Sequence, residues 1–168
     1  MKTKDLLKLS PKELTDMGIC PTCLNKKYNG AIFGDDSNLL LYTDDEIEIA
    51  FVPNPRAQGH MMIGSQKHYH DMSEAPDALN TKMICFAKQC MKILKKVYSC
   101  ERVYLCTMCD GPANHYHLQL IPRFANEERG SLNFVKPRTD YIFNAKNFAT
   151  IKKKIATFAK TYEKKNKS

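Results

Sequence analysis

The hydrophobic period changes along the chain, and this change restricts the fold more than any other feature. Residues 39–65 and 102–122 contain short apolar stretches with strand character. Between them, residues 73–98 place apolar side chains at steps of three and four, which predicts an amphipathic helix. The positions are Leu79, Met83, Phe86, Cys90, Leu94 and Val97. A similar pattern over residues 144–164 predicts a second helix, and the whole order predicts an α+β fold with a mostly antiparallel sheet packed against helices.

Local signals predict where several elements begin, turn and end. The stretch SPKE predicts a short capped helix over residues 10–17. CPTCLNKKYNG, which follows it, has the composition of a turn-rich knuckle. TDDE predicts a hairpin turn between the first two strands, and Asp110-Gly111, at the start of the turn DGPAN, predicts a hairpin between the last two. Residues 126–141 have no regular pattern.

Bulk composition limits the class of protein. A chain of 168 residues suits a single domain, 1–168, and it contains no apolar run near the roughly 20 residues that cross a bilayer. Seven cysteines, an odd number, favour reduced thiols and a metal site over a disulfide framework, and we expect a cytoplasmic protein. The net charge of +8 favours an anionic partner, a phosphorylated small molecule or nucleic acid, although the basic tail also fits a solvated helix face.

The segment NHYHLQLIPR, residues 114–123, alternates polar and apolar side chains. On a strand, His115, His117 and Gln119 would share one face, while Tyr116 and Leu118 would face the core. Two histidines on an exposed strand face are also compatible with plain surface residues. A preceding Gly-containing turn, whose N–H groups could bind an anion, and the cation of Arg123 favour a reactive site instead. A neutral imidazole is a competent nucleophile near neutral pH.

CPTC offers two cysteines at a spacing that can bind one metal ion. A tetrahedral site needs two further ligands, and His68, His70 and His115 are the candidates. A redox pair and two plain thiols are the alternatives, since no βαβ pattern surrounds the motif. His60 follows a glycine at the start of a predicted strand, which also fits a buried, hydrogen-bonded histidine.

Two segments together resemble the histidine-triad (HIT) family. FVPNPRAQGHMMIGSQKHYHDM resembles the stretch before the long helix of these proteins, and NHYHLQLIPR resembles their signature strand. The resemblance covers residues 18–124, the core of the domain, and leaves residues 125–168 as a C-terminal extension. It implies a HIT-like antiparallel sheet packed against helices with an N-terminal zinc knuckle, to which the apolar pattern adds a C-terminal helix. It also implies a homodimer and a nucleotidyl-histidine intermediate formed from nucleoside phosphates or dinucleoside polyphosphates.

The resemblance also implies roles for individual residues. His117 matches the nucleophile, and a structural zinc ion would be bound by Cys20, Cys23, His115 and His68, with His70 as the fallback for His68. Contacts to the phosphoryl oxygens and the nucleoside are expected from Gln119, His60, Asn54, Arg123 and the turn Gly111 to Asn114. Magnesium is compatible with a polyphosphate substrate.

Two positions depart from the usual pattern of the family. The third signature residue is Gln119 rather than histidine, as in the galactose-1-phosphate uridylyltransferase and dinucleoside-polyphosphate phosphorylase branches. An amide cannot exchange a proton near neutral pH, so the leaving group must be a good one or be protonated by another group. Val52 stands where many relatives have Asn or Asp on the ribose, and Asn54 is the substitute.

Three alternatives follow from these observations. Water rather than phosphate as the acceptor would make the protein a hydrolase instead of a nucleotidyltransferase or phosphorylase. A zinc-stabilised, non-catalytic module would bind nucleotides or nucleic acid through the basic tail and RGSLNFVKPR, which holds Arg129, Lys136, Arg138 and Phe134. As a third alternative, that same segment folds over the active site and contacts substrate phosphates.

Overall fold

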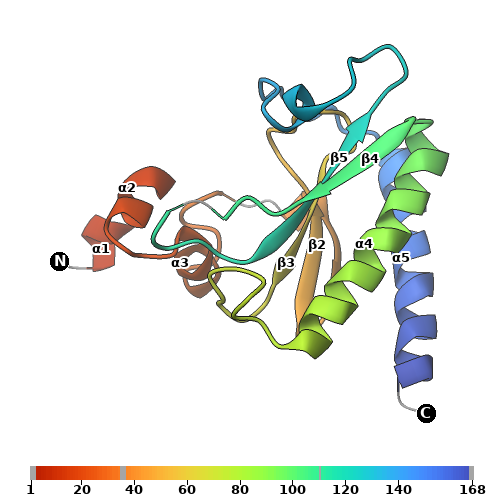
Figure 1. Cartoon of the computed structure of the whole chain (residues 1–168). Helices are drawn as coiled ribbons and strands as arrows, with labels where there is room; N and C mark the ends of the chain where they lie inside the picture. Colours follow the sequence, from red (N-terminus) through yellow and green to blue (C-terminus); the bar gives the residue numbers. More distant parts are fainter. Residues whose placement is uncertain (1–2, 35–36, 110, 167–168) are drawn as a thin grey trace.

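A computed structural model describes residues 3–34, 37–109 and 111–166 (Figure 1). Five strands form one sheet in the order β1-β2-β3-β5-β4, and every neighbouring pair is antiparallel. The strands are β1 (Leu40–Thr43), β2 (Ile47–Phe51), β3 (Met61–Ser65), β4 (Arg102–Cys106) and β5 (His117–Arg123). The α+β architecture and the antiparallel sheet that the sequence predicts are therefore confirmed.

Two long helices cover one face of the sheet (Figure 1). They are α4 (Asp77–Tyr98) and α5 (Ala145–Asn166), and both were predicted from their apolar spacing. Met83 and Phe86 of α4 pack in one cluster with Ile63 of β3 and Leu118 of β5. The core is completed by α5, because its side chains Ile151, Ile155 and Ala159 are buried in the same cluster. Each fully buried isoleucine contributes about 2 kcal/mol of transfer free energy.

The N-terminal segment forms three short helices on the other side of the sheet (Figure 1). They are α1 (Thr3–Leu6), α2 (Pro11–Asp16) and α3 (Pro21–Lys27). At α2 the predicted cap is confirmed, since Ser10 and Glu13 form a reciprocal capping box. The predicted turn-rich knuckle is wrong in one respect, because residues 21–27 are helical. Pro21 occupies the first helical position, and the Cys20 sulfur accepts a hydrogen bond from the N–H of Cys23.

The predicted hairpin between the last two strands is confirmed, since β4 and β5 are consecutive strands and antiparallel neighbours. β4 ends at Cys106 and β5 begins at His117, so the connection is longer than the sequence predicts. Asp110 itself lies outside the described residues, but Gly111 has φ +84°, and a Cβ added there would lie 2.9 Å from Thr15 Cγ2. Glycine therefore permits this connection to approach the N-terminal helices closely.

The extension after β5 contains a short 3-10 helix, η2 (Ser131–Phe134), and a second one, η1 (Ser37–Leu39), precedes β1. The ring of Phe134 lies 5.1 Å from that of Tyr104 on β4, so η2 packs beside the edge of the sheet. Within the described residues, every helix is too short or too polar to span a lipid bilayer.

Candidate functional site

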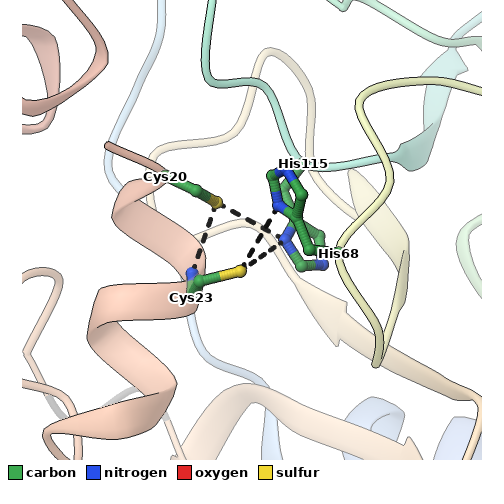
Figure 2. A group of neighbouring side chains, drawn as sticks. All are labelled: Cys20, Cys23, His68 and His115. Atoms are coloured by element: carbon green, nitrogen blue, oxygen red, sulfur yellow. Dashed lines mark hydrogen bonds between the residues drawn. The ribbon is translucent and has the colours of Figure 1, made fainter. Parts of the chain in front are cut away.

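Four side chains from three separate segments meet beside the N-terminus of α3. Figure 2 shows the sulfurs of Cys20 and Cys23 pointing toward the rings of His68 and His115. The Cys23 Sγ lies 3.4 Å from Nδ1 of each histidine, and the Cys20 Sγ lies 3.5 Å from Nδ1 of His115. All four ligand atoms lie within 4.8 Å of one another. The group could hold a metal ion.

The donor set and its spacing fit tetrahedral zinc. With Zn–S near 2.3 Å and Zn–N near 2.0 Å, sulfur and nitrogen ligands lie about 3.5 Å apart, close to the distances found here. The far nitrogen of His115, Nε2, donates a hydrogen bond to the Ser65 carbonyl at 2.8 Å, which leaves Nδ1 free to bind a cation. Burial, and then the neighbouring Cys20, raise the pKa of the Cys23 thiol, so a bound cation would have to displace its proton.

The structure distinguishes the two candidates for the third ligand. His68 points into the group, whereas His70 is absent from it. The Nδ1 of His70 instead lies 3.0 Å from a carboxylate oxygen of Glu74, and the same carboxylate accepts the His70 N–H. His70 is therefore held by its own loop, and His68 is the residue available to a metal.

Several contacts tie this group to the sheet. Lys26, on α3, donates to the Gln66 side chain at 3.0 Å and to the Ser65 carbonyl, and it pairs with Glu48 of β2 at 3.3 Å. The N–H of Tyr116 donates to the Tyr69 carbonyl, which connects the loop after β3 to the start of β5. These contacts join the helix, the loop and the strand that contribute the four side chains.

Beside this group, a chain of hydrogen bonds crosses the face of the sheet to His117. The N–H of Arg56 donates to Nδ1 of His60 at 3.1 Å, so the proton of His60 is on Nε2, which donates to Oε1 of Gln119 at 3.1 Å. The amide nitrogen of Gln119 in turn donates to Nε2 of His117 at 3.2 Å. Finally, Nδ1 of His117 donates to the His115 carbonyl at 2.7 Å.

The two ends of this chain determine the direction of every bond in it. A backbone N–H can only donate and a backbone carbonyl can only accept, so both histidines have a defined tautomer. His117 is left with its lone pair on Nε2. His60 is fully buried, and its burial, followed by the charges of Arg138 and Arg56, lowers its pKa to about 4 against a raising contribution from Gln119. His60, the first histidine in this chain of hydrogen bonds, is therefore neutral near pH 7.

A pocket of about 200 Å³ lies on one side of His117. Its walls come from the N-terminal segment, from β3 and from the loop before β5, and its lining residues are Thr15, Pro21, Thr22, Phe33, Met62, Ala113, Asn114, His115 and His117. The Phe33 side chain is 44% exposed, so an aromatic ring is available at the pocket. The pocket thus combines apolar and hydroxyl groups with the side chain of His117.

The predicted shared face of the signature segment is confirmed for two of its three members. His117 and Gln119 alternate on β5, and Gln119 stands between Met62 of β3 and Cys106 of β4. His115 precedes the strand, and its ring turns toward the cysteines. The neighbouring Tyr116 is fully buried, as its position in the pattern predicts.

Other predicted site residues take different places. The Asn114 side chain lines the pocket but donates to the His70 carbonyl, and Gly111 lies on the same connection, against Thr15. Asn54 is exposed, and its carbonyl accepts from Arg138 at 2.8 Å.

The position of Arg123 argues against the contact with substrate that was predicted from the sequence. Its guanidinium is only 3% exposed and pairs with Glu101 at 2.8 Å. It also donates to the carbonyls of Phe124 and Glu127. This charge is therefore used inside the fold, where it joins the end of β5 to the start of β4.

Sequence reasoning did not single out Phe33, Ser65 or Arg56. Ser65 contributes a main-chain carbonyl, for which a side-chain pattern carries no signal. Phe33 lies in a segment that matched no motif. Arg56 could have been found, because a cation four residues before His60 is visible in NPRAQGH.

Comparison with known proteins agrees with this geometry. Residues 35–126, more than half of the chain, match the model of the HIT domain. An uncharacterised HIT-like protein of Methanocaldococcus jannaschii is 30% identical over 105 residues, which are 57% of this chain and 77% of the relative.

Solved structures share the fold at low sequence identity. A zinc-bound histidine triad family protein from Mycobacterium smegmatis superposes with a TM-score of 0.56 at 12% identity, over 73% of this chain and 87% of that one. A HIT-like protein of Bartonella henselae has a TM-score of 0.52 at 20% identity, over 70% and 83%. The fold, the domain match and the curated relative lead to one conclusion: the chain belongs to the histidine-triad (HIT) family.

Proposed function

We propose that the protein is an enzyme that attacks nucleoside phosphates or dinucleoside polyphosphates through His117. The observation that carries the proposal is the directed hydrogen-bond chain, which leaves a lone pair on Nε2 of His117, a residue that lines the pocket. A nucleophilic imidazole needs this tautomer, and the His115 carbonyl enforces it.

In the first step, Nε2 of His117 forms a bond to the α-phosphorus, and the bond from phosphorus to the leaving oxygen breaks with its electron pair on oxygen. The nucleoside occupies the pocket, where Phe33 and Met62 provide apolar contacts and Thr22 a hydroxyl. In the second step, an acceptor oxygen from water or phosphate attacks the same phosphorus, and the N–P electron pair returns to Nε2 of His117. A water acceptor releases its proton to solvent, whereas a phosphate oxyanion has none to lose.

Gln119 exchanges partners during the first step. Its amide N–H donates to the attacking nitrogen in the resting protein, and it turns to a phosphoryl oxygen as the N–P bond forms. His60, which is neutral and donates to the Gln119 carbonyl oxygen, holds the amide in the orientation that presents this N–H.

Zinc in this proposal has a structural role. Cys20, Cys23, His68 and His115 would hold it, and four protein ligands leave no position for a reacting water. The ion would fix α3 and the loop after β3 against the start of β5, and so fix the carbonyl to which His117 donates. One zinc ion per chain by elemental analysis is the expected result.

The central test is detection of the covalent intermediate. We expect mass spectrometry of the protein incubated with a panel of nucleoside phosphates to show the added mass of one nucleotide, and peptide mapping to place it on His117. A matched His117→Asn protein should show none. If the adduct forms on another residue, or if His117→Asn turns over the same substrates, the nucleophile is not His117.

The acceptor is tested with the same protein. Turnover that requires inorganic phosphate and yields a nucleoside diphosphate would identify a phosphorylase, as Gln119 favours. Turnover of equal rate without phosphate would identify a hydrolase. The homodimer and the cytoplasmic location implied by the resemblance are carried forward as proposals, which light scattering and cell fractionation test.

A further inference from the structure

The C-terminal extension lies directly on the loop that leads to His60 (Figure 1). The N–H of Thr139 donates to the Pro55 carbonyl at 2.9 Å, and the Gln58 side chain donates to the Ile142 carbonyl at 2.8 Å. Arg138 donates to the Asn54 carbonyl. Arg56, in turn, donates to the carbonyl of Lys136. The extension and the loop therefore place two arginines side by side.

These two arginines lack counter-ions within the part of the chain that the structure describes. The cations Lys82 and Arg123 pair with carboxylates, and Lys136 pairs with Glu127. Arg56 and Arg138 make no such ion pair among the described residues, and the Nε–H of Arg56 is buried without a hydrogen-bond acceptor there. Burial, and then the charge of Arg56, lower the pKa of Arg138. Two uncompensated guanidinium groups at short range favour an anion between them.

The arginine pair lies near the hydrogen-bond chain that ends at His117, because the charges of both arginines act on His60. The main-chain N–H of Arg56 is the first donor of the chain that runs through His60 and Gln119. Burial raises the pKa of the Cys106 thiol, and the charge of Arg56 lowers it. Cys106 is the cross-strand partner of Gln119. A group bound at His117 would thus be close to the pocket and to the two cations.

We propose that Arg56 and Arg138 bind a second phosphate group, the one attached to the phosphorus that His117 attacks. This inference rests on the proposed function and narrows it to substrates whose leaving group is itself a phosphate, such as nucleoside di- and triphosphates or dinucleoside polyphosphates. Arg138 is exposed and can reach a ligand, and Arg56 is anchored by the extension.

The arginine pair explains how the reaction can proceed although Gln119 cannot donate a proton to the leaving group. When the bond between the α-phosphorus and the bridging oxygen breaks, the departing phosphate takes the electron pair and gains negative charge. Two guanidinium groups stabilise that charge without donating a proton to the oxygen. A leaving group such as an amine needs a proton, and neither an amide nor a guanidinium gives one up near neutral pH.

The experiment measures affinity in a protein that cannot react. In the His117→Asn background, isothermal titration with AMP and ADP, repeated with UMP and UDP, gives the preference for the diphosphate. We expect Arg138→Ala to reduce that preference about tenfold, since charge-assisted hydrogen bonds are lost, while monophosphate affinity stays within about twofold. Arg138→Lys should restore part of it. Arg102→Ala, which removes an exposed arginine at the start of β4, should leave the preference unchanged.

Arg56→Gln provides a second variant, and its thermal unfolding is measured because Arg56 also anchors the extension. An unchanged diphosphate preference in both Arg138→Ala and folded Arg56→Gln would overturn the inference. Adduct formation on wild-type His117 is measured in parallel. If adducts form while the preference is unchanged, the phosphate site is wrong and the proposed function stands; if neither nucleotide binding nor adducts are found, the proposed function itself fails.

A titration with inorganic phosphate identifies the source of the bound group. In one outcome, free phosphate binds, loses affinity in Arg138→Ala and remains bound in the presence of AMP. This result would show that the same two arginines also bind the phosphate that attacks in the second step. Competition between free phosphate and ADP, without competition from AMP, would confirm that the site is the one next to the α-phosphate.

Discussion

His115 and His117 are two residues apart, yet the structure uses them in different ways. His115 faces the cysteines and has its far nitrogen fixed by a main-chain carbonyl, so its free nitrogen can serve a metal ion. His117 faces the pocket and also donates to a main-chain carbonyl, so its free nitrogen can serve a phosphorus atom. The same device, a carbonyl that selects the tautomer, prepares one ring for binding and the other for reaction. What differs is the neighbour: two thiols in one case and an amide in the other.

The variant His117→Asn should distinguish the roles of His115 and His117 most clearly. Removing a nucleophile should lower kcat by about 10⁴-fold, near 5 kcal/mol of activation free energy. Zinc content and the midpoint of thermal unfolding should stay close to those of wild type, because the ring does not touch the cysteines. Steady-state kinetics and elemental analysis on one preparation provide both values. Loss of zinc in this variant would mean that the two histidines act as one unit.

Removal of the metal tests the other histidine. Cys20→Ser, or a chelator applied to wild type, should lower the free energy of unfolding by about 4 kcal/mol, because a structural metal site links segments that are far apart in sequence. Urea unfolding followed by circular dichroism measures the change. Turnover per folded molecule should fall too, since the metal fixes the carbonyl that orients His117. Full stability after complete zinc removal would rule out the structural role.

Acid should lower the free energy of unfolding, because the buried, neutral His60 must take up a proton. Its folded-state pKa of about 4 lies below the ordinary value of 6.5, so the unfolded chain binds more protons between these two pH values. Stability is therefore complete above pH 6.5 and falls by about 3 kcal/mol as the pH is lowered to 4. The pKa of His115 is also lowered to about 4, mainly by burial, so the His60 contribution is the difference in pH dependence between wild type and His60→Gln. Identical pH dependence in the two proteins would contradict the buried neutral state of His60.

The smallest effect is expected at Gln119. In Gln119→Leu the Nε2–H of His60 loses its acceptor, which should cost about 1 to 2 kcal/mol of stability. The attacking nitrogen is freed, but the donor to the phosphoryl oxygen is lost, and we expect kcat to fall about tenfold. Gln119→Asn, whose shorter amide cannot reach both histidines, serves as the matched variant. A faster reaction in Gln119→Leu would show that the resting amide only blocks His117.

Much of the fold was predictable because its elements have strong local signals. The apolar spacing of α4 and α5, the alternation in β5 and the capping box at Ser10 each depend on near neighbours in sequence. The helix at residues 21–27 was missed because its polar composition suggested turns, although Pro21 at its start was a helix signal. Composition alone misleads where a segment is fixed by tertiary contacts such as those of Lys26.

The site was predictable to the extent that residue type determined it. Cysteines and histidines at recognisable spacing pointed to the metal group, whose four members are brought together as expected. The choice between His68 and His70 depended on Glu74, four residues after His70, which no metal motif includes. Arg123 was assigned to substrate from its charge, but its partner Glu101 comes from a different segment and only the packed sheet brings them together. The arginine pair likewise depends on an extension that residue spacing could not place.

The part played by α5 has a consequence for how the protein is made. Ile151, Ile155 and Ala159 close the apolar face of the sheet, so the segments synthesised earlier cannot bury that face by themselves. During translation, the apolar face of β1 to β5 and α4 therefore stays exposed to solvent until the chain through residue 159 has left the ribosome. A shortened gene that ends after the signature strand would leave the same surface open permanently, and its product should be recovered from cells as insoluble aggregate.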